Sequence, residues 1–370
     1  MASRSPRVMV MWSNPKAANL GVRALAEGTA GLLRRSFGRD TVVDYPVFED
    51  EPLRGMLSNR SLAVGLLTTA GRLHERVRSY DFLVESGGGD SFTDIYGLSR
   101  LARMAHVHRV ASKARIPVVL GPQTIGPFET FTGRAMGRRM LRTARIVLAR
   151  DPASAEHARV LGRTPDALAT DVVFTLPQPA SIQRRDIVLN VSGLLWSENS
   201  HIDFRQYRVA TRALVRAALA DGRSITVLPH VLDNPSIDND VPVSLELKDE
   251  FADVELYLPS SLADARAVLG SAEVVVGSRM HACLNALSAG TAAFPWAYSR
   301  KFLPLMSDLG WINGVDLRTE ADPASLTLTY LRKRDKAADL ERIHGLRERA
   351  ALRLQSAVDA LRLNLSEHLS

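Results

Sequence analysis

The sequence predicts an α/β protein of two Rossmann-like lobes, each with a mostly parallel sheet, and a ligand cleft between the lobes. The chain has 370 residues, and at roughly 100–200 residues per domain this length fits two domains. Short apolar runs alternate with helical patterns of about 10–20 residues, which is the order of parallel β-α-β units. The alternation stops at a polar, proline-containing stretch and then restarts, which indicates two successive sheets.

The first lobe is predicted over residues 1–180. Each of its strands is a short apolar run, and most are followed by a loop and a helical pattern. Asp151 is a good N-cap and Pro152 suits the first position of a helix. The predicted strands are Val8–Trp12, Thr41–Tyr45, Asp81–Glu85, Ile116–Leu120 and Arg145–Ala149, and the helices are Leu20–Arg35, Ser61–Val77, Tyr96–Ala114, Gly133–Thr143 and one that opens at Asp151.

The second lobe is predicted over residues 186–330, after a linker that begins at Pro177. Residues 331–370 are predicted as a C-terminal helix that packs on one of the lobes, because its leucines and other apolar residues recur every three or four positions. The strands of this lobe are Ile187–Val191, Ser224–Leu228, Glu273–Val276 and, as the final one, Ala292–Phe294, and its helices are Phe204–Ala220, Ser261–Leu269 and Arg279–Ala289.

The composition is that of a globular protein with a small basic excess, 47 Lys and Arg against 40 Asp and Glu. Cys283 is the only cysteine, so an intrachain disulfide is impossible and a cysteine zinc site is disfavoured. No apolar run reaches the roughly 18 residues of a membrane span, and no apolar segment follows the basic N-terminus as in a secretory signal. We therefore expect a cytoplasmic protein.

The excess of positive charge is spread along the chain, mostly as arginine. Solvated helix faces explain such a spread, and attraction to phosphate ligands, nucleic acid or acidic lipid headgroups is the functional alternative. The sequence has no compact basic block. Aromatic residues make up only 6% of the chain, which is too few for obvious base-stacking surfaces. We expect no nucleic-acid partner.

Ligands of open parallel sheets bind beyond the carboxyl ends of the strands, so residues that follow each strand are the candidates. In the first lobe, Gly87-Gly88-Gly89-Asp90 fits either a close approach to a ligand or a tight packing turn. Gln123 lies in a loop shaped by proline and glycine. Arg150 has a donor fork that fits a phosphate or carboxylate, or pairs with a neighbouring acid. Asp171 fits a base, an acceptor for a sugar hydroxyl or a helix cap.

Polar residues also follow the first strands of the second lobe. Asn190–Gly193 and His230 each follow a predicted strand. Asp238-Asn239-Asp240 could hold a divalent metal through its carboxylates, but its setting favours a solvated turn. His106 and His108 are two positions apart in a helical pattern and do not share a face, which argues against a metal site.

The sharpest local signal is Gly277-Ser278-Arg279-Met280-His281-Ala282, which follows an apolar strand and opens a helix. Ser278 is the expected N-cap. Arg279 and His281 would then lie in the first turn, where the helix dipole favours an anion. This setting suits a dianion, and a histidine there could exchange protons near neutral pH.

Together and in this order, the segments resemble the polysaccharide pyruvyl transferase family through most of the chain. One departure is the start, where the family's Asn-x-Gly-Asp is Asn19-Leu20-Gly21-Val22, so an acceptor contact from that Asp is in question. The segments that carry the resemblance are Gly87–Asp90, Gly121–Phe128, Arg150–Ser154, Asp171 with Phe174, Pro229-His230 with Asn239-Asp240, Ser278–Ala282 and Tyr298–Lys301.

The resemblance implies a GT-B-like fold and an enzyme that makes cell-surface polysaccharide or glycolipid. Such an enzyme moves pyruvate from phosphoenolpyruvate to two sugar hydroxyls as a cyclic ketal. The resemblance implies no metal and no cofactor besides the donor substrate. Its partners would be phosphoenolpyruvate and a saccharide acceptor, which a basic surface would let it meet at the inner face of the membrane. The sequence selects neither the acceptor sugar nor an oligomeric state.

The resemblance also assigns residues. Arg279 looks like the family's donor-binding arginine and Arg150 like a second one, since guanidinium forks fit both anions of phosphoenolpyruvate. Our hypothesis makes His281 the general acid or base, with His230 and Asp171 in reserve on the acceptor side. The donor group comprises Arg150, Ser278, Arg279, Met280 and His281, and the acceptor side or cleft comprises Gly88, Gly89, Asp90, Gln123, Asp171, His230 and Asp240.

Two other functions fit the same residues less well. A GT-B-type glycosyltransferase would place the diphosphate of a nucleotide sugar on the same arginine and helix start. A basic protein that only binds nucleic acid or a polysaccharide-assembly complex would instead carry its arginines as a surface stripe. Convergence of Arg150, Arg279 and His281 in one cleft would favour the enzyme.

Overall fold

The computed structural model describes residues 5–46, 72–89, 92–95, 97–180 and 182–369, and the chain divides into two compact units. Unit 1 comprises Met1–Lys16, Leu25–Leu176 and Ala350–Ser370. Unit 2 comprises Ala17–Ala24 and Pro177–Arg349. From the sequence, one break is predicted between residues 180 and 186, and residues 331–370 are predicted as a separate helix. In the structure, a short N-terminal segment joins unit 2 and the last helix contributes to both units.

Unit 1 is built on a six-stranded sheet in the order β2-β1-β3-β4-β5-β6, with every neighbouring pair parallel. All five predicted strands are present. The sixth, β6, was not predicted because two residues are too few for a periodic signal. The strands are β1 (Arg7–Met11), β2 (Val42–Asp44), β3 (Phe82–Glu85), β4 (Val118–Gln123), β5 (Ile146–Ala149) and β6 (Ala167–Leu168).

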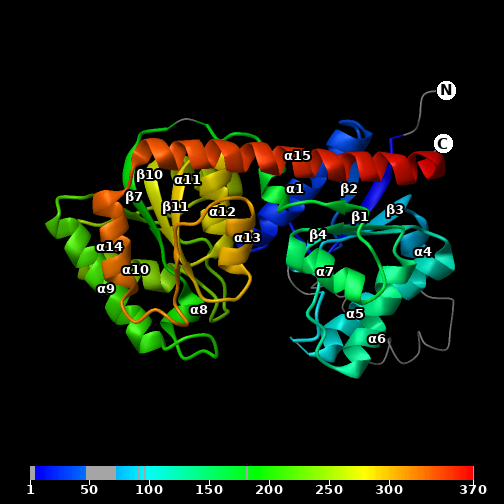
Figure 1. The fold of residues 1–370 in the computed structure, drawn as a ribbon, viewed down its shortest axis with the longest axis horizontal. Coiled ribbons are helices and arrows are strands. Elements are labelled where there is room, and N and C mark those ends of the chain that lie inside the picture. Colours follow the sequence, from blue (N-terminus) through cyan, green and yellow to red (C-terminus); the bar gives the residue numbers. More distant parts are fainter. Residues whose placement is uncertain (1–4, 47–71, 90–91, 96, 181, 370) are drawn as a thin grey trace. The chain divides into compact units, whose positions relative to one another are not determined.

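Helices cover both faces of this sheet (Figure 1). Asp151 caps α7 as predicted, because its side chain accepts a hydrogen bond from the Ser154 amide. Residues 61–71 of the predicted helix Ser61–Val77 lie outside the described residues, as does Tyr96. The helices are α1 (Leu20–Phe37), α4 (Arg72–Arg78), η1 (Gly87–Gly89), α5 (Leu98–Ala114), α6 (Phe131–Thr143), α7 (Pro152–Val160) and η2 (Val172–Thr175).

The alternation of side chains along β1 explains the two layers of core in unit 1. Val8 and Val10 pack in one cluster with residues of α1 and of the C-terminal part of α15 (Lys336–Leu369). Met9 and Met11 point to the opposite face and pack with residues of α4 and α5. The continuous apolar run Val8–Met11 is therefore buried on both faces of the sheet, as expected for a parallel sheet.

Unit 2 contains a second six-stranded parallel sheet, in the order β12-β11-β10-β7-β8-β9. The prediction that Ala292–Phe294 is the final strand is wrong, because β12 adds a short edge strand beyond it. The strands are β7 (Arg185–Asn190), β8 (Ile225–Val227), β9 (Glu255–Leu256), β10 (Ala272–Gly277), β11 (Ala292–Ala297) and β12 (Val315–Asp316).

In unit 2, α11 and α12 lie on one side of the strands, and α9 and α14 lie on the other (Figure 1). Within the described ranges, no helix is both long and apolar enough to cross a lipid bilayer. The helices that precede α15 are α8 (Gly193–Trp196), α9 (Phe204–Ala220), α10 (Val241–Glu250), α11 (Leu262–Ser271), α12 (Met280–Ala289), α13 (Phe302–Asp308) and α14 (Pro323–Lys333).

Candidate active site

The strand order of unit 2 reverses between β7 and β10, and ligands of open α/β sheets bind beyond the strand ends at such a point. Asn190 is the last residue of β7, and Ser278 and Arg279 follow β10. The Asn190 carbonyl accepts a hydrogen bond from the Ser278 amide at 3.0 Å, and its Oδ1 accepts one from the Arg279 amide at 3.0 Å. These two bonds fix the backbone that carries Arg279.

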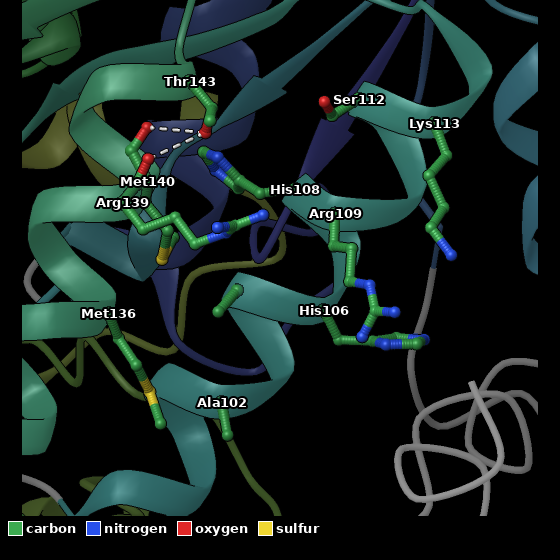
Figure 2. A pocket seen from close by; sticks show the side chains of 11 residues that line it. Ala102, His106, His108, Arg109, Ser112, Lys113, Met136, Arg139, Met140 and Thr143 are labelled. Atoms are coloured by element: carbon green, nitrogen blue, oxygen red, sulfur yellow. Dashed lines mark hydrogen bonds between the residues drawn. The ribbon is translucent and has the colours of Figure 1, made fainter. Parts of the chain in front are cut away.

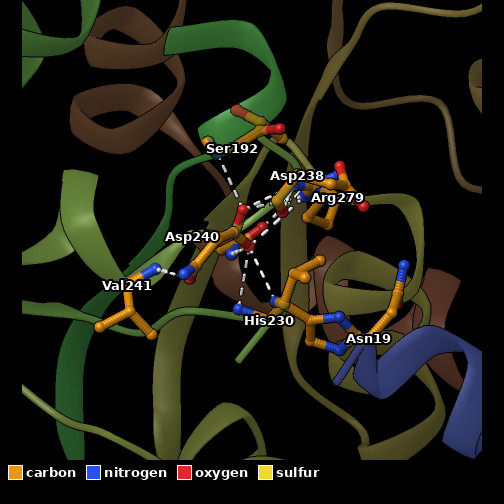
Figure 3. A network of polar contacts seen from close by, with 12 residues as sticks. Asn19, Ser192, His230, Asp238, Asp240, Val241 and Arg279 are labelled. Atoms are coloured by element: carbon orange, nitrogen blue, oxygen red, sulfur yellow. Dashed lines mark hydrogen bonds and ion pairs between the residues drawn. The ribbon is translucent and has the colours of Figure 1, made fainter. Parts of the chain in front are cut away.

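The Arg279 side chain binds two aspartates (Figure 3). Its Nη2 donates to Asp240 Oδ1 at 2.6 Å and to the Asp238 carbonyl at 2.7 Å. Its Nη1 donates to Asp238 Oδ1 at 2.6 Å, and its Nε lies 3.2 Å from Asp240 Oδ1. Four of the five guanidinium N–H groups are thus directed at the two aspartates, which leaves one on Nη1 for a ligand.

Burial and neighbouring charge have opposite effects on the pKa of Arg279, which is 7% exposed. Burial lowers the pKa of the guanidinium, but Asp240 and Asp238 raise it by more, so the net shift is upward. The side chain is therefore a permanent, oriented positive charge. Two carboxylates already compensate this charge, so an incoming anion would displace Asp238 or use the remaining N–H group on Nη1.

Asp240 organises the loops around this cation. It is fully buried, and its Oδ2 accepts hydrogen bonds from the amides of His230 at 3.0 Å and Val231 at 2.9 Å. Its Oδ1 also accepts one from the Gly193 amide at 2.8 Å. The interpretation of residues 238–240 as a solvated turn is wrong, because both carboxylates bind the Arg279 guanidinium.

His230 is held neutral beside this network. Burial lowers its pKa well below the usual histidine value, and the nearby His281 and Arg279 lower it further. Asn285 Oδ1 accepts a hydrogen bond from Arg266 at 2.7 Å, which turns the Asn285 amide nitrogen toward His230 Nε2, 3.2 Å away. Nε2 must then accept, so the proton of the neutral ring is on Nδ1.

His281 follows Arg279 by two residues and lies against the N-terminal segment of unit 2. A Cβ added at Gly21 would be 3.0 Å from the Cβ of His281, so only glycine fits this contact without movement. Asn19 Oδ1 accepts a hydrogen bond from the Gly21 amide at 2.8 Å, and the Leu20 amide donates to the His230 carbonyl at 2.9 Å. This segment therefore positions both histidines.

The predicted N-cap role of Ser278 is wrong. Helix α12 begins at Met280, Arg279 occupies the cap position, and no side chain caps the helix. The Ser278 hydroxyl instead accepts a hydrogen bond from the buried Tyr207 hydroxyl at 2.7 Å. Tyr207 in turn accepts one from the Ser192 amide at 3.0 Å. A long-range partner thus competes with the local cap and takes the hydroxyl.

In unit 1, Arg150 follows β5 and is fully buried. Its Nη1 donates to Asp171 Oδ2 at 3.2 Å, and its Nη2 donates to the Thr124 hydroxyl. Its Nε is 4.0 Å from Asp151. Asp171 is also fully buried, and its Oδ1 caps the short helix η2 by accepting from the Val173 amide at 3.0 Å. Three roles were predicted for Asp171, and the structure shows the one as a helix cap.

Gln123 and the glycine turn lie at neighbouring strand ends of unit 1. Gln123 is the last residue of β4, so the loop predicted from Gly121 begins three residues later than expected. Its Nε2 donates to the Glu85 carbonyl at 3.0 Å. Gly87 has φ +57°, and a Cβ there would be 1.8 Å from Gln123 Oε1. Gly88 also has positive φ, whereas Asp90 lies outside the described residues.

The structure brings together four predicted site residues in unit 2, namely Ser278, Arg279, His230 and Asp240. Met280 is the first residue of α12 and His281 the second, both partly exposed. Arg150, Gln123 and Asp171 belong to unit 1, and their convergence with Arg279 and His281 in one cleft stays a prediction. In the part of the chain that the structure describes, no group of three or more His, Cys, Asp or Glu could hold a metal ion.

Sequence reasoning missed the residues that hold the site. Asp238 was named only in a metal pair, although it binds Arg279 directly. Asn285 and Tyr207 carried no motif, because each acts across a distance of more than 50 residues. The missed signal was compositional: an isolated Asn on the buried face of α12, among apolar neighbours, needs a polar partner.

Known structures resemble the fold of the whole chain at low sequence identity. S. aureus MnaA, solved with UDP, matches with a TM-score of 0.55 and 10% identity over 96% of this chain and 97% of its own. UDP-GlcNAc 2-epimerase from Neisseria meningitidis, bound to UDP-GlcNAc, has a TM-score of 0.55 and 11% identity over 95% and 100%. The α,α-trehalose 6-phosphate synthase from Burkholderia multivorans has a TM-score of 0.50 and 10% identity, over 100% of this chain and 98% of its own. These likenesses show a GT-B-like fold.

No curated protein matches the sequence. The family model for polysaccharide pyruvyl transferase matches residues 19–300, which include the Asn19 segment, the Arg150 strand end and the complete network around Arg279. This chain therefore belongs to the polysaccharide pyruvyl transferase family.

Proposed function

We propose that this protein transfers the pyruvate unit of phosphoenolpyruvate to two hydroxyls of a saccharide and releases phosphate. The observation that carries the proposal is the buried, permanently charged Arg279, fixed by Asp240 at the switch point of the unit 2 sheet. Phosphoenolpyruvate carries a phosphate and a carboxylate, and a guanidinium recognises either one. Family membership supplies the type of reaction, and the site supplies an anion-binding group.

The proposed reaction balances two protons. One acceptor hydroxyl loses its proton, C3 of the donor gains one, and the hydroxyl oxygen bonds to C2. The C2–O bond to phosphate then breaks as the second hydroxyl closes the ketal, and its proton leaves with the phosphate. Arg279 stabilises the departing dianion electrostatically. His281, beside it and partly exposed, transfers a proton as general acid or base.

His230 takes a different role from His281 in this scheme. Because burial, His281 and Arg279 keep the pKa of His230 low, its ring stays neutral while the anionic substrate binds. Its ring is fixed by Asn285, so it orients the acceptor side rather than cycling a proton. Arg150 is proposed as the second donor-binding arginine, and Gln123 and Asp171 as residues of the acceptor side.

Calorimetric titration with phosphoenolpyruvate tests the donor without knowledge of the acceptor. We expect saturable binding to the wild type and about tenfold or greater weakening in Arg279→Lys, which keeps the charge but loses the planar fork. Arg332→Lys is the matched control, because Arg332 makes an exposed ion pair with Asp221 in the same unit. Thermal unfolding of each variant checks that it is folded.

Two results would overturn the proposal. The first is saturable binding of UDP-GlcNAc or another nucleotide sugar with no binding of phosphoenolpyruvate, which would favour a glycosyltransferase. The second is phosphoenolpyruvate binding that Arg279→Lys and Arg332→Lys weaken equally, which would show a non-specific effect of charge.

A further inference from the structure

A cavity of about 590 Å³ lies between α5 and α6 in unit 1 (Figure 2). Its volume is within the roughly 300–1,000 Å³ typical of small-molecule sites. None of its lining residues belongs to the strand ends that carry the sequence-predicted site. Its lining residues are Ala102, Ala105, His106, His108, Arg109, Ser112, Lys113, Met136, Arg139, Met140 and Thr143.

The lining combines an apolar part with positive charge. Ala102, Ala105 and Met136 supply apolar surface from both helices, and the buried Met140 extends it. Arg109, Lys113 and Arg139 also line the cavity, and no carboxylate of the described residues does so. Lys113 and Arg139 are exposed, and neither forms an ion pair with another described residue. The charges of Lys113 and Arg139 are therefore available to an anion.

Two histidines that line the cavity show that it is positively charged and that it contains a buried side chain without a hydrogen-bond partner. Burial lowers the pKa of His106, and the positive charges of Arg109 and Lys113 lower it further, as expected in a locally positive field. His108 is 3% exposed, and neither of its ring nitrogens has a hydrogen-bond partner among the described residues, although Nε2 lies 3.9 Å from Glu85 Oε1. Figure 2 shows its ring directed toward α6. A buried polar group that lacks a partner is costly unless water or a ligand satisfies it.

We propose that this cavity binds an amphiphilic anion, a phosphate monoester whose headgroup lies at Lys113 and Arg139 and whose alkyl chain lies against Ala102, Ala105 and Met136. Several cations favour a dianionic phosphate over a singly charged headgroup. The neutral His108 ring provides a hydrogen bond deep in the cavity. This site is separate from donor binding in unit 2 and does not depend on the proposed reaction.

Calorimetry with octyl phosphate tests the proposal, with inorganic phosphate and octanol as the charged and apolar halves of the probe. We expect octyl phosphate to bind at least about tenfold more tightly than either half. The variant Lys113→Gln/Arg139→Gln should weaken octyl phosphate binding by about tenfold or more. The control Arg138→Gln/Arg142→Gln removes the same charge from exposed positions of α6 that do not line the cavity.

A second variant tests the apolar part independently of charge. Ala102→Trp fills the end of the cavity near the start of α5 and should abolish octyl phosphate binding while leaving phosphoenolpyruvate binding unchanged. The proposal is overturned if inorganic phosphate binds as tightly as octyl phosphate, if the two double variants weaken binding equally, or if octyl phosphate shows no saturable binding to the folded wild type.

Vesicles distinguish the two sources of such a ligand. Sedimentation with phosphatidic acid vesicles that is lost in Lys113→Gln/Arg139→Gln, retained in Arg138→Gln/Arg142→Gln and competed by octyl phosphate would identify a membrane lipid. Octyl phosphate binding without vesicle binding would identify a soluble phosphate ester. Both results support an amphiphilic phosphate in this cavity.

Discussion

Each unit presents an arginine just after a strand, β5 in unit 1 and β10 in unit 2, but the two arginines are surrounded differently. Arg150 of unit 1 binds one buried carboxylate, that of Asp171, and a threonine hydroxyl. Arg279 of unit 2 binds two carboxylates and a carbonyl, and its main partner, Asp240, also receives three backbone amides. The arginine of unit 2 is therefore held by a network, whereas that of unit 1 is held by a pair.

The hydrogen bonding of buried polar side chains differs less sharply between the units. At the strand ends of unit 1, the Ser13 hydroxyl, Gln123 Oε1 and the Thr170 hydroxyl are buried without a hydrogen-bond partner among the described residues. At those of unit 2, the side chains of the Arg279 network are hydrogen-bonded, but the Ser192 hydroxyl has no such partner. The network around Arg279 is thus organised before any ligand binds, while both edges keep hydrogen-bonding capacity for water or a ligand.

The largest expected effect is on the stability of unit 2. Asp240→Ala leaves a buried guanidinium and three amides without their acceptor, so we expect a loss of about 3–5 kcal/mol in the free energy of unfolding. Asp238→Ala should cost only about 1 kcal/mol, because the Asp238 side chain is 34% exposed. Urea unfolding monitored by tryptophan fluorescence measures both losses of stability, since Trp196, Trp296 and Trp311 all belong to unit 2. Equal losses would show that the network is not centred on Asp240.

The second expected effect is a pH dependence of unit 1. Burial raises the pKa of Glu85 to about 8, and the polar Trp12 side chain lowers it only in part. Because the folded pKa lies above the unfolded value, protonated Glu85 stabilises the fold at low pH and this contribution is lost as pH rises toward 8. Between pH 5 and 8 the wild type should lose on the order of 3 kcal/mol more than Glu85→Gln.

Circular dichroism of urea unfolding at pH 5 and pH 8 measures this difference. The control is Glu156→Gln, whose carboxylate makes an exposed ion pair with Arg159 and should leave the pH dependence unchanged. Parallel losses in the wild type and in Glu85→Gln would mean that Glu85 ionises normally and that the strand end is hydrated.

The third effect concerns affinity and rests on the proposed function. Asp238 occupies N–H groups of Arg279 that an incoming anion would use. Asp238→Asn should therefore tighten phosphoenolpyruvate binding by about fivefold, or about 1 kcal/mol. Calorimetry measures it, with Asp316→Asn, from the exposed pair with Arg318, as control. Weaker binding would mean that Asp238 positions Arg279 rather than competing with the ligand.

The smallest expected effect is on the stability that the N-cap of helix α7 contributes to unit 1. Asp151 caps α7 in unit 1, so Asp151→Ala should cost about 1 kcal/mol of stability, whereas Asp151→Asn should retain most of it. Thermal unfolding resolves such a difference. If both substitutions cost the same, the charge of Asp151, which lies 4.0 Å from Arg150, contributes more than the cap.

Much of the fold could be predicted because parallel strands buried on both faces leave long apolar runs in the sequence. Helix Phe204–Ala220 was predicted to the residue, and the strands of unit 1 within a few residues. Edge strands such as β6 and β12 were missed because two residues carry no periodicity. The segment around Arg279 was found because its residues are adjacent in the chain.

The sequence by itself determined the two α/β units, the family resemblance and the strand ends at which polar residues gather. Only the tertiary structure decided which partners those residues take. Asp240 and Arg279 are 39 positions apart, and Ser278 and Tyr207 are 71 apart, so no local pattern reveals either contact. The physical reason is that a buried polar group bonds to whatever the fold places within about 3 Å of it, and that neighbour is set by strand order rather than by sequence distance.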